Sequence, residues 1–366
     1  MKKRISTLFI QLFLAFVLLE IGILILSKTE LIKLEEPIYT FENSRRYWAE
    51  IDEDFGVWRH PNYKFRHKKT CFDVRYETNS IGARDKERSV VSNGNKRVVL
   101  LGDSFAEGWG VNVEDRFSNL LEEETGSDFL NFAVSGAGMT QQYLIYRNKA
   151  MEYDHDAVLW AIFPINDLID DDINYHKKYS YDRYRAYWVG DYPNYHLEHG
   201  LDSIQQSHYY LESPDRLKVL LKNFTYTYNL LRWFKNRQRK YSKPEFQQKN
   251  EPDYFYFTEA QWDRIRYNIE KMKDLLGDKK LYVFTLPGEH TIKAYQNGNN
   301  SVPLRDSLKV LSSELDFEYL DLLENTDTKV GFDWSSYYYN EDCDVHWNEL
   351  GHKWAATSIK EGFSLE

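Results

Sequence analysis

A serine follows directly on an apolar, β-branched run, Val98 to Leu101, with only Gly102 and Asp103 between them. Such a run is typical of a buried parallel strand, and open α/β sheets place their active sites at the carboxyl ends of such strands. Ser104 would also precede a helix, whose first N–H groups stabilise negative charge. Two interpretations follow: Ser104 is a nucleophile, or it caps the next helix, since Ser and Asp are the usual capping residues.

A histidine that could activate this serine lies near the C-terminus. Asp344 and His346 are two residues apart in a loop before the last expected helix. At that spacing the carboxylate can orient the imidazole and stabilise the imidazolium that forms when the serine proton is taken. The structural alternative is that His346 caps the helix or fills a gap under Trp347, because a single motif match has a high false-positive rate.

Two further turns follow the next two expected strands. Gly136 lies in the turn after the second strand, and Asn166 with Asp167 follows the third. The carboxyl ends of parallel strands share one edge of the sheet, so these turns lie beside Ser104. A glycine N–H and an asparagine amide are suitable donors to the oxyanion of a tetrahedral intermediate.

Alternating strands and helices are expected to position these turns. The expected strands are 97–101, 128–134, 157–163, 280–286 and 318–322, and the expected helices are 115–125, 140–151, 259–276, 302–315 and 349–361. This alternation predicts an α/β fold with a parallel five-stranded sheet and helices on both faces. The segment 168–252, crowded with tyrosine, histidine, aspartate and lysine and partly helical over 209–239, is interpreted as an insertion that covers the carboxyl edge.

The N-terminus carries a predicted transmembrane helix. Residues 5–27 are almost wholly apolar, follow a basic tail of residues 1–4, and are long enough as a helix to span roughly 30 Å of hydrocarbon. The basic tail predicts a single-pass protein of the cytoplasmic (inner) membrane with its catalytic domain exported, periplasmic or otherwise extracytoplasmic. A cleaved signal peptide is the alternative, although no A-x-A site follows. Glu20 interrupts the run, and we expect it to snorkel or to meet a partner helix.

Residues 28–95 mix aromatic and charged residues with Asn, Gly and Pro. They predict short strands and turns that pack on the main domain, residues 96–366, because a disordered spacer would carry fewer large apolar side chains. The only two cysteines are Cys71 and Cys343. In an exported domain they could form a disulfide, but the sequence does not show that they meet.

Composition and spacing exclude several classes of function. The 366 residues are 42% hydrophobic, enough for a sizeable core, and the net charge of −10 argues against nucleic-acid binding. Residues 108–110 lack the third glycine of a dinucleotide loop, so no cofactor is expected. No metal is expected either, because His346 and His352 lack zinc spacing and the acidic cluster of Asp167 and 170–172 lacks EF-hand spacing and is interpreted as a solvated turn.

Taken together, the motifs resemble the four blocks of the SGNH/GDSL hydrolase superfamily, in the same order, from about residue 96 to the C-terminus without the insertion. They are Gly102-Asp103-Ser104, Gly136, Asn166-Asp167 and Asp344-Val345-His346. The resemblance implies a three-layer α/β/α sandwich similar to flavodoxin, with Ser104 as nucleophile, His346 as base and Asp344 as third triad member. It also implies an oxyanion hole formed by the Ser104 N–H, the Gly136 N–H and the Asn166 side chain, with Asp103 and Asp167 in supporting positions.

Two positions depart from the superfamily pattern. Pro164 stands where the third block usually has glycine, which should stiffen the turn and could shift Asn166. Cys343 stands where the last block, D-x-x-H, usually has its aspartate, and Asp342 is the less favoured orienter. The D-x-H-W sequence that results resembles the alginate O-acetyltransferase branch, and the N-terminal anchor resembles membrane-anchored SGNH proteins of bacterial envelopes.

These patterns predict a membrane-anchored serine esterase or deacylase that removes ester-linked acyl groups, foremost acetyl, from an envelope glycan. The expected partners are an acylated carbohydrate substrate, the membrane and envelope polysaccharide-assembly proteins. Two alternatives stay open: an O-acetyltransferase for a cell-surface polysaccharide, and a catalytically degenerate SGNH module that binds or assembles glycans.

Overall fold

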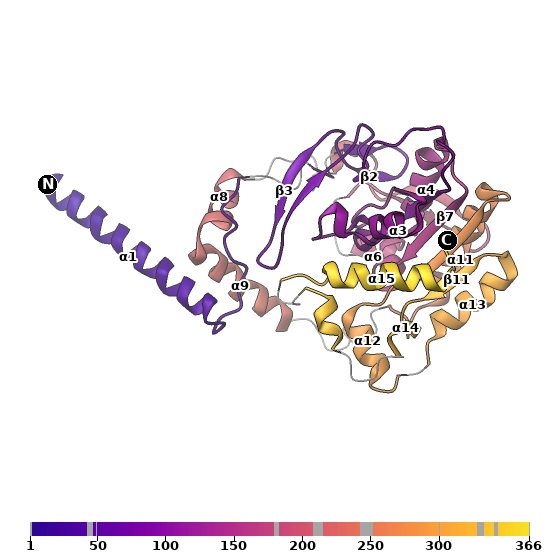
Figure 1. Ribbon diagram of the computed structural model, residues 1–366. Helices are drawn as coiled ribbons and strands as arrows, with labels where there is room; N and C mark the ends of the chain where they lie inside the picture. The colour runs from indigo at the N-terminus through magenta and orange to yellow at the C-terminus, as the bar shows by residue number, and fades with distance from the viewer. Residues whose placement is uncertain are drawn as a thin grey trace.

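The strands that precede the candidate site residues form one parallel sheet in the computed structural model (Figure 1). The structure describes residues 2–41, 47–48, 50–178, 183–207, 215–241, 252–299, 301–327, 333–339 and 343–365. The strand order across the sheet is β11 (Glu318–Asp321), β10 (Lys280–Thr285), β7 (Ala157–Ile162), β5 (Arg97–Leu101) and β6 (Asp128–Asn131). Numbered along the chain this is the order 2-1-3-4-5 of flavodoxin-like sheets. The predicted α/β class and five-stranded parallel sheet are confirmed.

Helices cover both faces of this sheet, because successive strand side chains point to opposite sides. Val99 and Leu101 belong to one buried cluster, and Val98 and Leu100 belong to the other. The first cluster is completed by α4 (Met139–Asn148), α11 (Glu259–Leu276) and α13 (Pro303–Leu315), and the second by α3 (Phe117–Thr125), α12 (Glu289–Gln296) and α15 (Glu349–Gly362). Three layers result.

Short elements follow the strands at their carboxyl ends. They are α2 (Ser104–Glu107) after β5, α5 (Pro164–Asp170) and α6 (Ile173–Lys178) after β7, and α14 (Glu324–Asp327) after β11. The second strand is shorter than predicted, since β6 ends at Asn131, although Phe132 and Val134 still donate backbone hydrogen bonds to the chain of β5 and its following glycine.

The segment before the sheet forms two antiparallel hairpins. They consist of β1 (Glu50–Asp52) with β2 (Gly56–Trp58), and β3 (Lys64–Lys68) with β4 (Asp73–Glu77). Phe55, Phe65 and Tyr76 are buried in the same cluster as the face of the sheet that carries α4. A disulfide between Cys71, at the tip of the second hairpin, and Cys343 ties this segment to the C-terminal loop.

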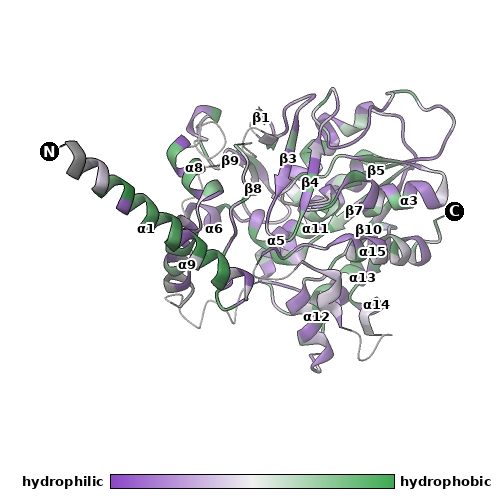
Figure 2. Cartoon of the chain, turned by 60° about the vertical axis from the view of Figure 1, so that its left-hand side comes forward, coloured by the Kyte–Doolittle hydropathy of each residue, from purple (hydrophilic) through white to green (hydrophobic). Residues whose placement is uncertain are grey.

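The first helix, α1 (Lys2–Lys28), projects from the body of the molecule (Figure 1). Ser6–Lys28 is long and apolar enough to cross a membrane, and most of its large apolar side chains are exposed. In Figure 2, α1 has the colour of hydrophobic residues over most of its length. By length and composition, α1 is a candidate membrane anchor or signal sequence.

Only part of the insertion lies at the carboxyl edge, where Arg185 contacts the Gly136 turn and Asp170. It contains the hairpin of β8 (Ala186–Val189) and β9 (His196–His199), followed by α8 (Arg216–Phe224) and α9 (Tyr226–Tyr241). Aromatic rings of this hairpin pack against α4 and α11; Trp188, for example, contacts Tyr143 and Tyr267. The two helices lie beside α1 instead (Figures 1 and 2). Aromatic rings that are buried against helices in this way are core residues of the domain.

Candidate active site

Ser104, His346 and Asp344 form one continuous series of hydrogen bonds. Nε2 of His346 lies 2.7 Å from the Ser104 hydroxyl oxygen, and Nδ1 of His346 lies 2.5 Å from Oδ1 of Asp344. Asp344 also accepts the backbone N–H of His346, which fixes the loop around the imidazole. With the proton on Nδ1, Nε2 is free to accept the serine proton. The structure therefore brings together the three residues that the two distant motifs had suggested as nucleophile, base and orienter.

The second oxygen of Asp344 has partners that sequence reasoning missed. Lys69 Nζ lies 2.7 Å from Oδ2, and the indole N–H of Trp109 donates to the same oxygen at 2.9 Å. Burial alone would raise the pKa of Asp344, but the hydrogen bonds and positive charges of His346 and Lys69 hold the pKa of this carboxyl well below its usual range. Asp344 is therefore an anion in the folded protein. The alternative orienter, Asp342, lies outside the described residues.

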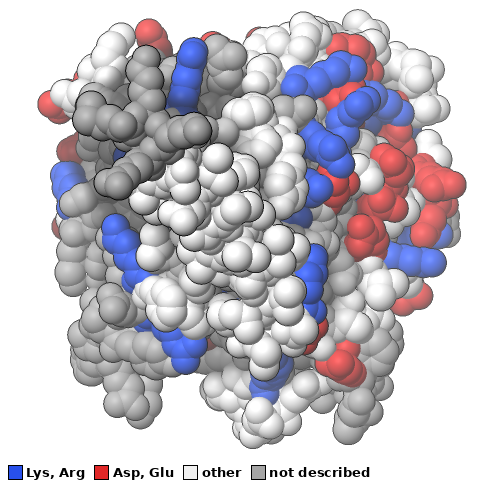
Figure 3. Space-filling view, turned by 90° about the vertical axis from the view of Figure 1, so that its left-hand side faces the viewer, with Lys and Arg blue, Asp and Glu red and all other residues white. Residues whose placement is uncertain are grey.

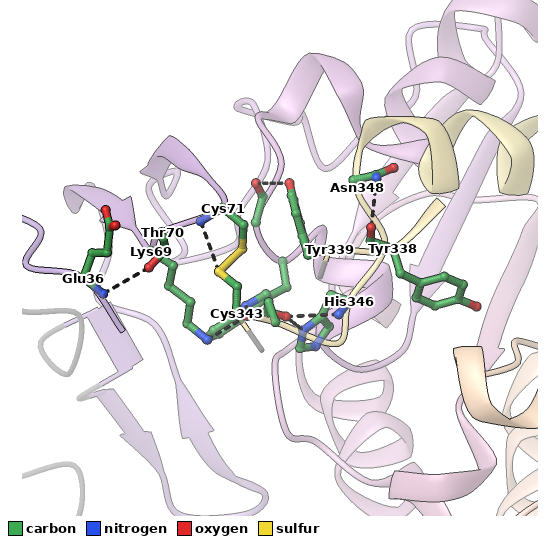
Figure 4. The surroundings of a disulfide bond; sticks show 12 residues. Glu36, Lys69, Thr70, Cys71, Tyr338, Tyr339, Cys343, His346 and Asn348 are labelled. Carbon is green, nitrogen blue, oxygen red and sulfur yellow. Dashed lines mark hydrogen bonds and ion pairs between the residues drawn. A yellow bond between two sulfur atoms is a disulfide. The ribbon is translucent and has the colours of Figure 1, made fainter. Parts of the chain in front are cut away.

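The disulfide explains how Lys69 reaches the catalytic loop. Cys343 directly precedes Asp344, and Cys71 lies two residues after Lys69, so one covalent link holds both ends of the ion pair (Figure 4). Thr70, between them, accepts a hydrogen bond from the backbone N–H of Glu36. A signal for this arrangement existed in the sequence. Each cysteine lies within two residues of a charged side chain, Lys69 or Asp344, so a disulfide between the cysteines would bring these two charges together.

The indole of Trp109 also orients the base directly. Its ring stacks on the His346 imidazole, with centroids 5.3 Å apart and an interplanar angle of 27°. Phe105 contacts the imidazole as well, at 4.8 Å between ring centroids. Together with the bond to Asp344, these contacts restrict the imidazole to the orientation that faces Ser104.

Ser104 is the first residue of α2, and its neighbour takes the capping role. The Asp103 carboxylate accepts the backbone N–H of Phe105, so the serine hydroxyl is not used as the cap. Burial raises the pKa of Asp103 to about 6, against the stabilising effect of this hydrogen bond. Asp103, and not Ser104, is thus the cap of α2, so Ser104 Oγ is available for its hydrogen bond with His346.

The three predicted oxyanion donors lie along the same edge of the sheet but are not equally available. The N–H groups of Ser104 and Gly136 have no acceptor in the part of the chain that the structure describes. Asn166 donates one amide hydrogen to Oδ2 of Asp103 at 3.1 Å, which leaves its second hydrogen for a substrate oxygen. Pro164 starts α5 two residues before Asn166, at a position where a missing N–H costs nothing.

A buried glutamate supports the turn that contains Gly136. Glu107, on α2, accepts hydrogen bonds from both the backbone N–H and the hydroxyl of Ser135, and Arg59 lies 3.5 Å from the same carboxylate oxygen. From the other side, Arg185 of the insertion donates to the carbonyl of Gly136. The Ser135–Gly136 turn is therefore held from two directions. Glu107 follows Ser104 by three residues, yet nothing in that spacing identified it.

Two of the acidic residues after β7, Asp167 and Asp171, are buried, which corrects their interpretation as part of a solvated turn, whereas Asp170 and Asp172 are half-buried. Asp167 accepts the backbone N–H of Phe163, and Asp171 accepts that of Thr140 at the start of α4. Burial raises the pKa of Asp171 to about 7, and burial together with the charge of Asp103 raises the pKa of Asp167 well above its usual value. These acids are spent on backbone groups, and the described residues contain no cluster arranged to hold a metal ion.

The geometry is suited to acyl transfer through serine. As Ser104 Oγ attacks a carbonyl carbon, its proton can pass to His346 Nε2 over 2.7 Å, while Asp344 stabilises the imidazolium. The N–H groups of Ser104 and Gly136 and the amide of Asn166 lie at the same edge of the sheet, and donors of this kind stabilise the negative charge that the carbonyl oxygen gains.

Comparison with known proteins gives no family by sequence: no protein-family model and no curated protein matches the chain. Solved structures to which it is similar include a lipase/acylhydrolase from Enterococcus faecalis (TM-score 0.39, 11% identity, 74% of this chain and 97% of that one). Another is a member of the lipolytic G-D-S-L family from Veillonella parvula (TM-score 0.36, 14% identity, 74% of this chain and 98% of that one). A third is a psychrotrophic esterase from a Pseudoalteromonas species (TM-score 0.36, 10% identity, 74% of this chain and 97% of that one). At such low identities and TM-scores, the chemistry of the site is argued from its own geometry.

Proposed function

We propose that the chain is a membrane-anchored serine esterase of the SGNH/GDSL type, which removes acyl groups, foremost acetyl, from an envelope glycan. The observation that carries the proposal is the hydrogen-bond series from Ser104 through His346 to Asp344. The anchor is α1, whose apolar surface is exposed to an extent that the core helix of a soluble protein would not tolerate. The glycan is supported by the polar part of the insertion beside the oxyanion donors, where Arg185 contacts the Gly136 turn.

The reaction proceeds in two steps. Ser104 Oγ attacks the ester carbonyl, its proton passes to His346, and the same proton is then given to the departing sugar oxygen as the ester bond breaks. Water then attacks the acyl-serine, losing a proton to His346, which returns it to Ser104 as the carboxylic acid leaves. In both steps the oxyanion is stabilised by the N–H groups of Ser104 and Gly136 and by the free amide hydrogen of Asn166.

A second candidate is O-acetyl transfer, favoured by the Asp344-Val345-His346-Trp347 sequence. The same acyl-serine would then pass its acyl group to a sugar hydroxyl in place of water. The exclusion of water from the closed site decides between the two outcomes.

The test uses the full-length protein in detergent or nanodiscs with p-nitrophenyl acetate and a fluorophosphonate probe. We expect ester turnover and covalent labelling at Ser104, both lost in Ser104→Ala. Ser313→Ala is a matched control, because Ser313 is an exposed serine of α13 whose hydroxyl is bonded to the carbonyl of Lys309 in its own helix. Equal turnover by wild type and Ser104→Ala, or an unlabelled protein, would overturn the serine mechanism and favour the glycan-binding module.

Acetylated and deacetylated glycans then identify the acceptor. Release of acetate from the acetylated glycan supports hydrolysis, and movement of a labelled acetyl group onto the deacetylated glycan supports transfer. An active serine that processes neither glycan would overturn the substrate assignment while leaving the esterase assignment intact.

A further inference from the structure

The two helices that end the insertion expose large apolar side chains on their outer faces. Leu217 and Leu220 lie three residues apart on α8, and Leu231 and Phe234 lie three residues apart on α9. Residues at this spacing share one face of a helix. Leu217 and Leu231 are 61% and 63% exposed, values typical of residues that have no protein neighbour on that side. Both helices are thus amphipathic, with one face that the described residues of the domain leave uncovered.

The helix α9 packs against α1. Ile23 of α1, Leu34 and Tyr226 at the start of α9 are buried against one another in a small cluster separate from the two main cores. In Figures 1 and 2, α8 and α9 lie on the side of the domain from which α1 projects. The medium that surrounds the C-terminal half of α1 therefore also reaches α8 and α9.

The corner between α8 and α9 satisfies its own backbone groups, as a segment in hydrocarbon must. Glu20, in the apolar run of α1, accepts the backbone N–H groups of Tyr226 and Thr227 at 2.6 and 2.9 Å. The carbonyl of Lys222 accepts the side-chain amide of Asn229. Two further carbonyls of the corner, those of Leu221 and Asn223, accept the Thr225 hydroxyl and the Tyr39 N–H.

Positive charges accompany the apolar faces. Arg232 and Lys222 pair with Glu35, which follows α1 in sequence, and Lys235 and Arg237 are exposed on α9. In Figure 3, viewed from the side of α1, Lys and Arg side chains lie around an uncharged central area. Basic residues beside an apolar helix face are typical of helices that lie in the interface of a bilayer with anionic lipids.

We propose that α8 and α9 form a second membrane element, a helical hairpin that lies in the bilayer interface beside α1. Its outer face contacts the upper acyl chains, its basic residues contact anionic headgroups, and Glu20 joins it to α1. The inference rests on the proposed membrane anchoring by α1 and extends it: the domain is seated on the lipid surface, whereas a single flexible tether would leave it free to tumble. A bilayer is favoured over a second copy of the chain because α9 packs directly against α1, which is long and apolar enough to cross a membrane.

The test measures the depth of single labelled cysteines in the full-length protein, reconstituted in vesicles of phosphatidylcholine and phosphatidylglycerol. The native cysteines are both in the disulfide, so each added cysteine is the only free thiol. An environment-sensitive fluorophore is attached at Leu217→Cys, Leu231→Cys, Leu12→Cys in α1, or Val310→Cys in α13. Val310 is the matched control, because it is an exposed apolar helix residue remote from α1 (59% exposed). Retained esterase activity shows that each labelled variant is folded.

We expect lipids that carry a nitroxide near the top of the acyl chain to quench the labels at 217 and 231 several-fold more than the label at 310. The label at 12 should be quenched by a nitroxide deeper in the chain. Quenching at 12 without quenching at 217 and 231 would overturn the hairpin while leaving the anchor standing. An unquenched label at 12 would overturn the anchoring itself. Labels at 217 and 231 that are shielded from both lipid and aqueous quenchers would show a protein partner and would also overturn the inference.

Discussion

The two carboxylate oxygens of Asp344 receive hydrogen bonds from very different parts of the chain. Oδ1 is bonded to His346, two residues further on, so this side of the site belongs to one short loop. Oδ2 is bonded to Lys69 and Trp109, which stand 275 and 235 residues away in the sequence. The local side contains the reacting groups, and the remote side holds them in place.

The difference lies in what each side does to the charge of Asp344. The local side uses the negative charge to stabilise the imidazolium that forms during catalysis. The remote side uses the same charge for an ion pair with Lys69, which fixes the carboxylate but opposes part of its effect on His346. Orientation and electrostatic stabilisation therefore compete at one side chain, and the variants below separate them.

Removing the charge on the local side should have the largest effect. In Asp344→Asn the imidazole loses the anion that stabilises its protonated form, and we expect kcat/KM for p-nitrophenyl acetate to fall by roughly 10³- to 10⁴-fold. The variant should also melt at a lower temperature, because the ionised Asp344 is stabilised by Lys69 and His346 in the folded protein, so kcat/KM is measured well below that melting temperature. A fall of less than about tenfold would mean that another group orients His346.

Removing the link between the two sides should chiefly affect stability. In the double variant Cys71→Ser, Cys343→Ser, the cross-link across 272 residues is lost, and we expect a free energy of unfolding lower by about 2–5 kcal/mol. Thermal melting of the variant, and of wild type with and without a reductant, measures this. Activity should fall as well, because Lys69 is no longer held beside Asp344. Unchanged activity would show that the β3–β4 hairpin keeps its place without the disulfide.

Acid should destabilise the helix that follows the local loop. Burial lowers the pKa of His352, on α15, to about 3, whereas the unfolded chain binds this proton near pH 6.5. Between pH 3 and pH 6.5 the unfolded state therefore binds more protons than the folded state. The contribution of His352 to the free energy of unfolding is complete above pH 6.5 and is lost as the pH falls toward 3. At pH 5 the loss from this one group is about 2 kcal/mol. His352→Gln should flatten melting temperature against pH, and His196→Gln, at an exposed position, should not.

Removing the charge on the remote side should have the smallest effect. Lys69 is one-third exposed, so its ion pair contributes only about 1 kcal/mol, and Lys69→Met should lower kcat/KM roughly fivefold. The loss should fall on kcat, with KM nearly unchanged, because Lys69 contacts Asp344 and not the reacting groups. Lys69→Arg should restore kcat, and Lys64→Met, on the same hairpin, should alter neither constant. A loss confined to KM would contradict the role of Lys69 in positioning Asp344.

The elements that position the local side could be predicted from the sequence because their signals are local. β5 occupies the predicted residues 97–101, since an unbroken apolar run ends there at a glycine. α11 occupies the predicted 259–276, where Thr258 and Gln261 form a capping box and Gly277 follows. The D-x-H spacing of Asp344 and His346 is also local.

The remote side could not be predicted, because it depends on contacts between distant segments. The possible pairing of Cys71 with Cys343 was the one signal for the position of Lys69, and nothing in the sequence pointed to Glu107, because its position follows from how the segments pack on the sheet. Pro164 illustrates a different difficulty. Its effect as a substitute for glycine was expected to be on the turn, but the chain uses it as the first residue of α5, a position that suits proline.

The contacts of Glu36 join the end of α1 to the hairpin beside the candidate active site. The Glu36 carboxylate is bonded to Ser27 and Lys28 at the end of α1, and its backbone N–H is bonded to Thr70 at the tip of the hairpin that holds Lys69. With α1 in a bilayer, this short series of contacts fixes the height of the active site above the headgroups. The enzyme would then search in two dimensions, and its reach would cover ester groups on glycans that are attached to the membrane or lie against it, and not those far out in the envelope.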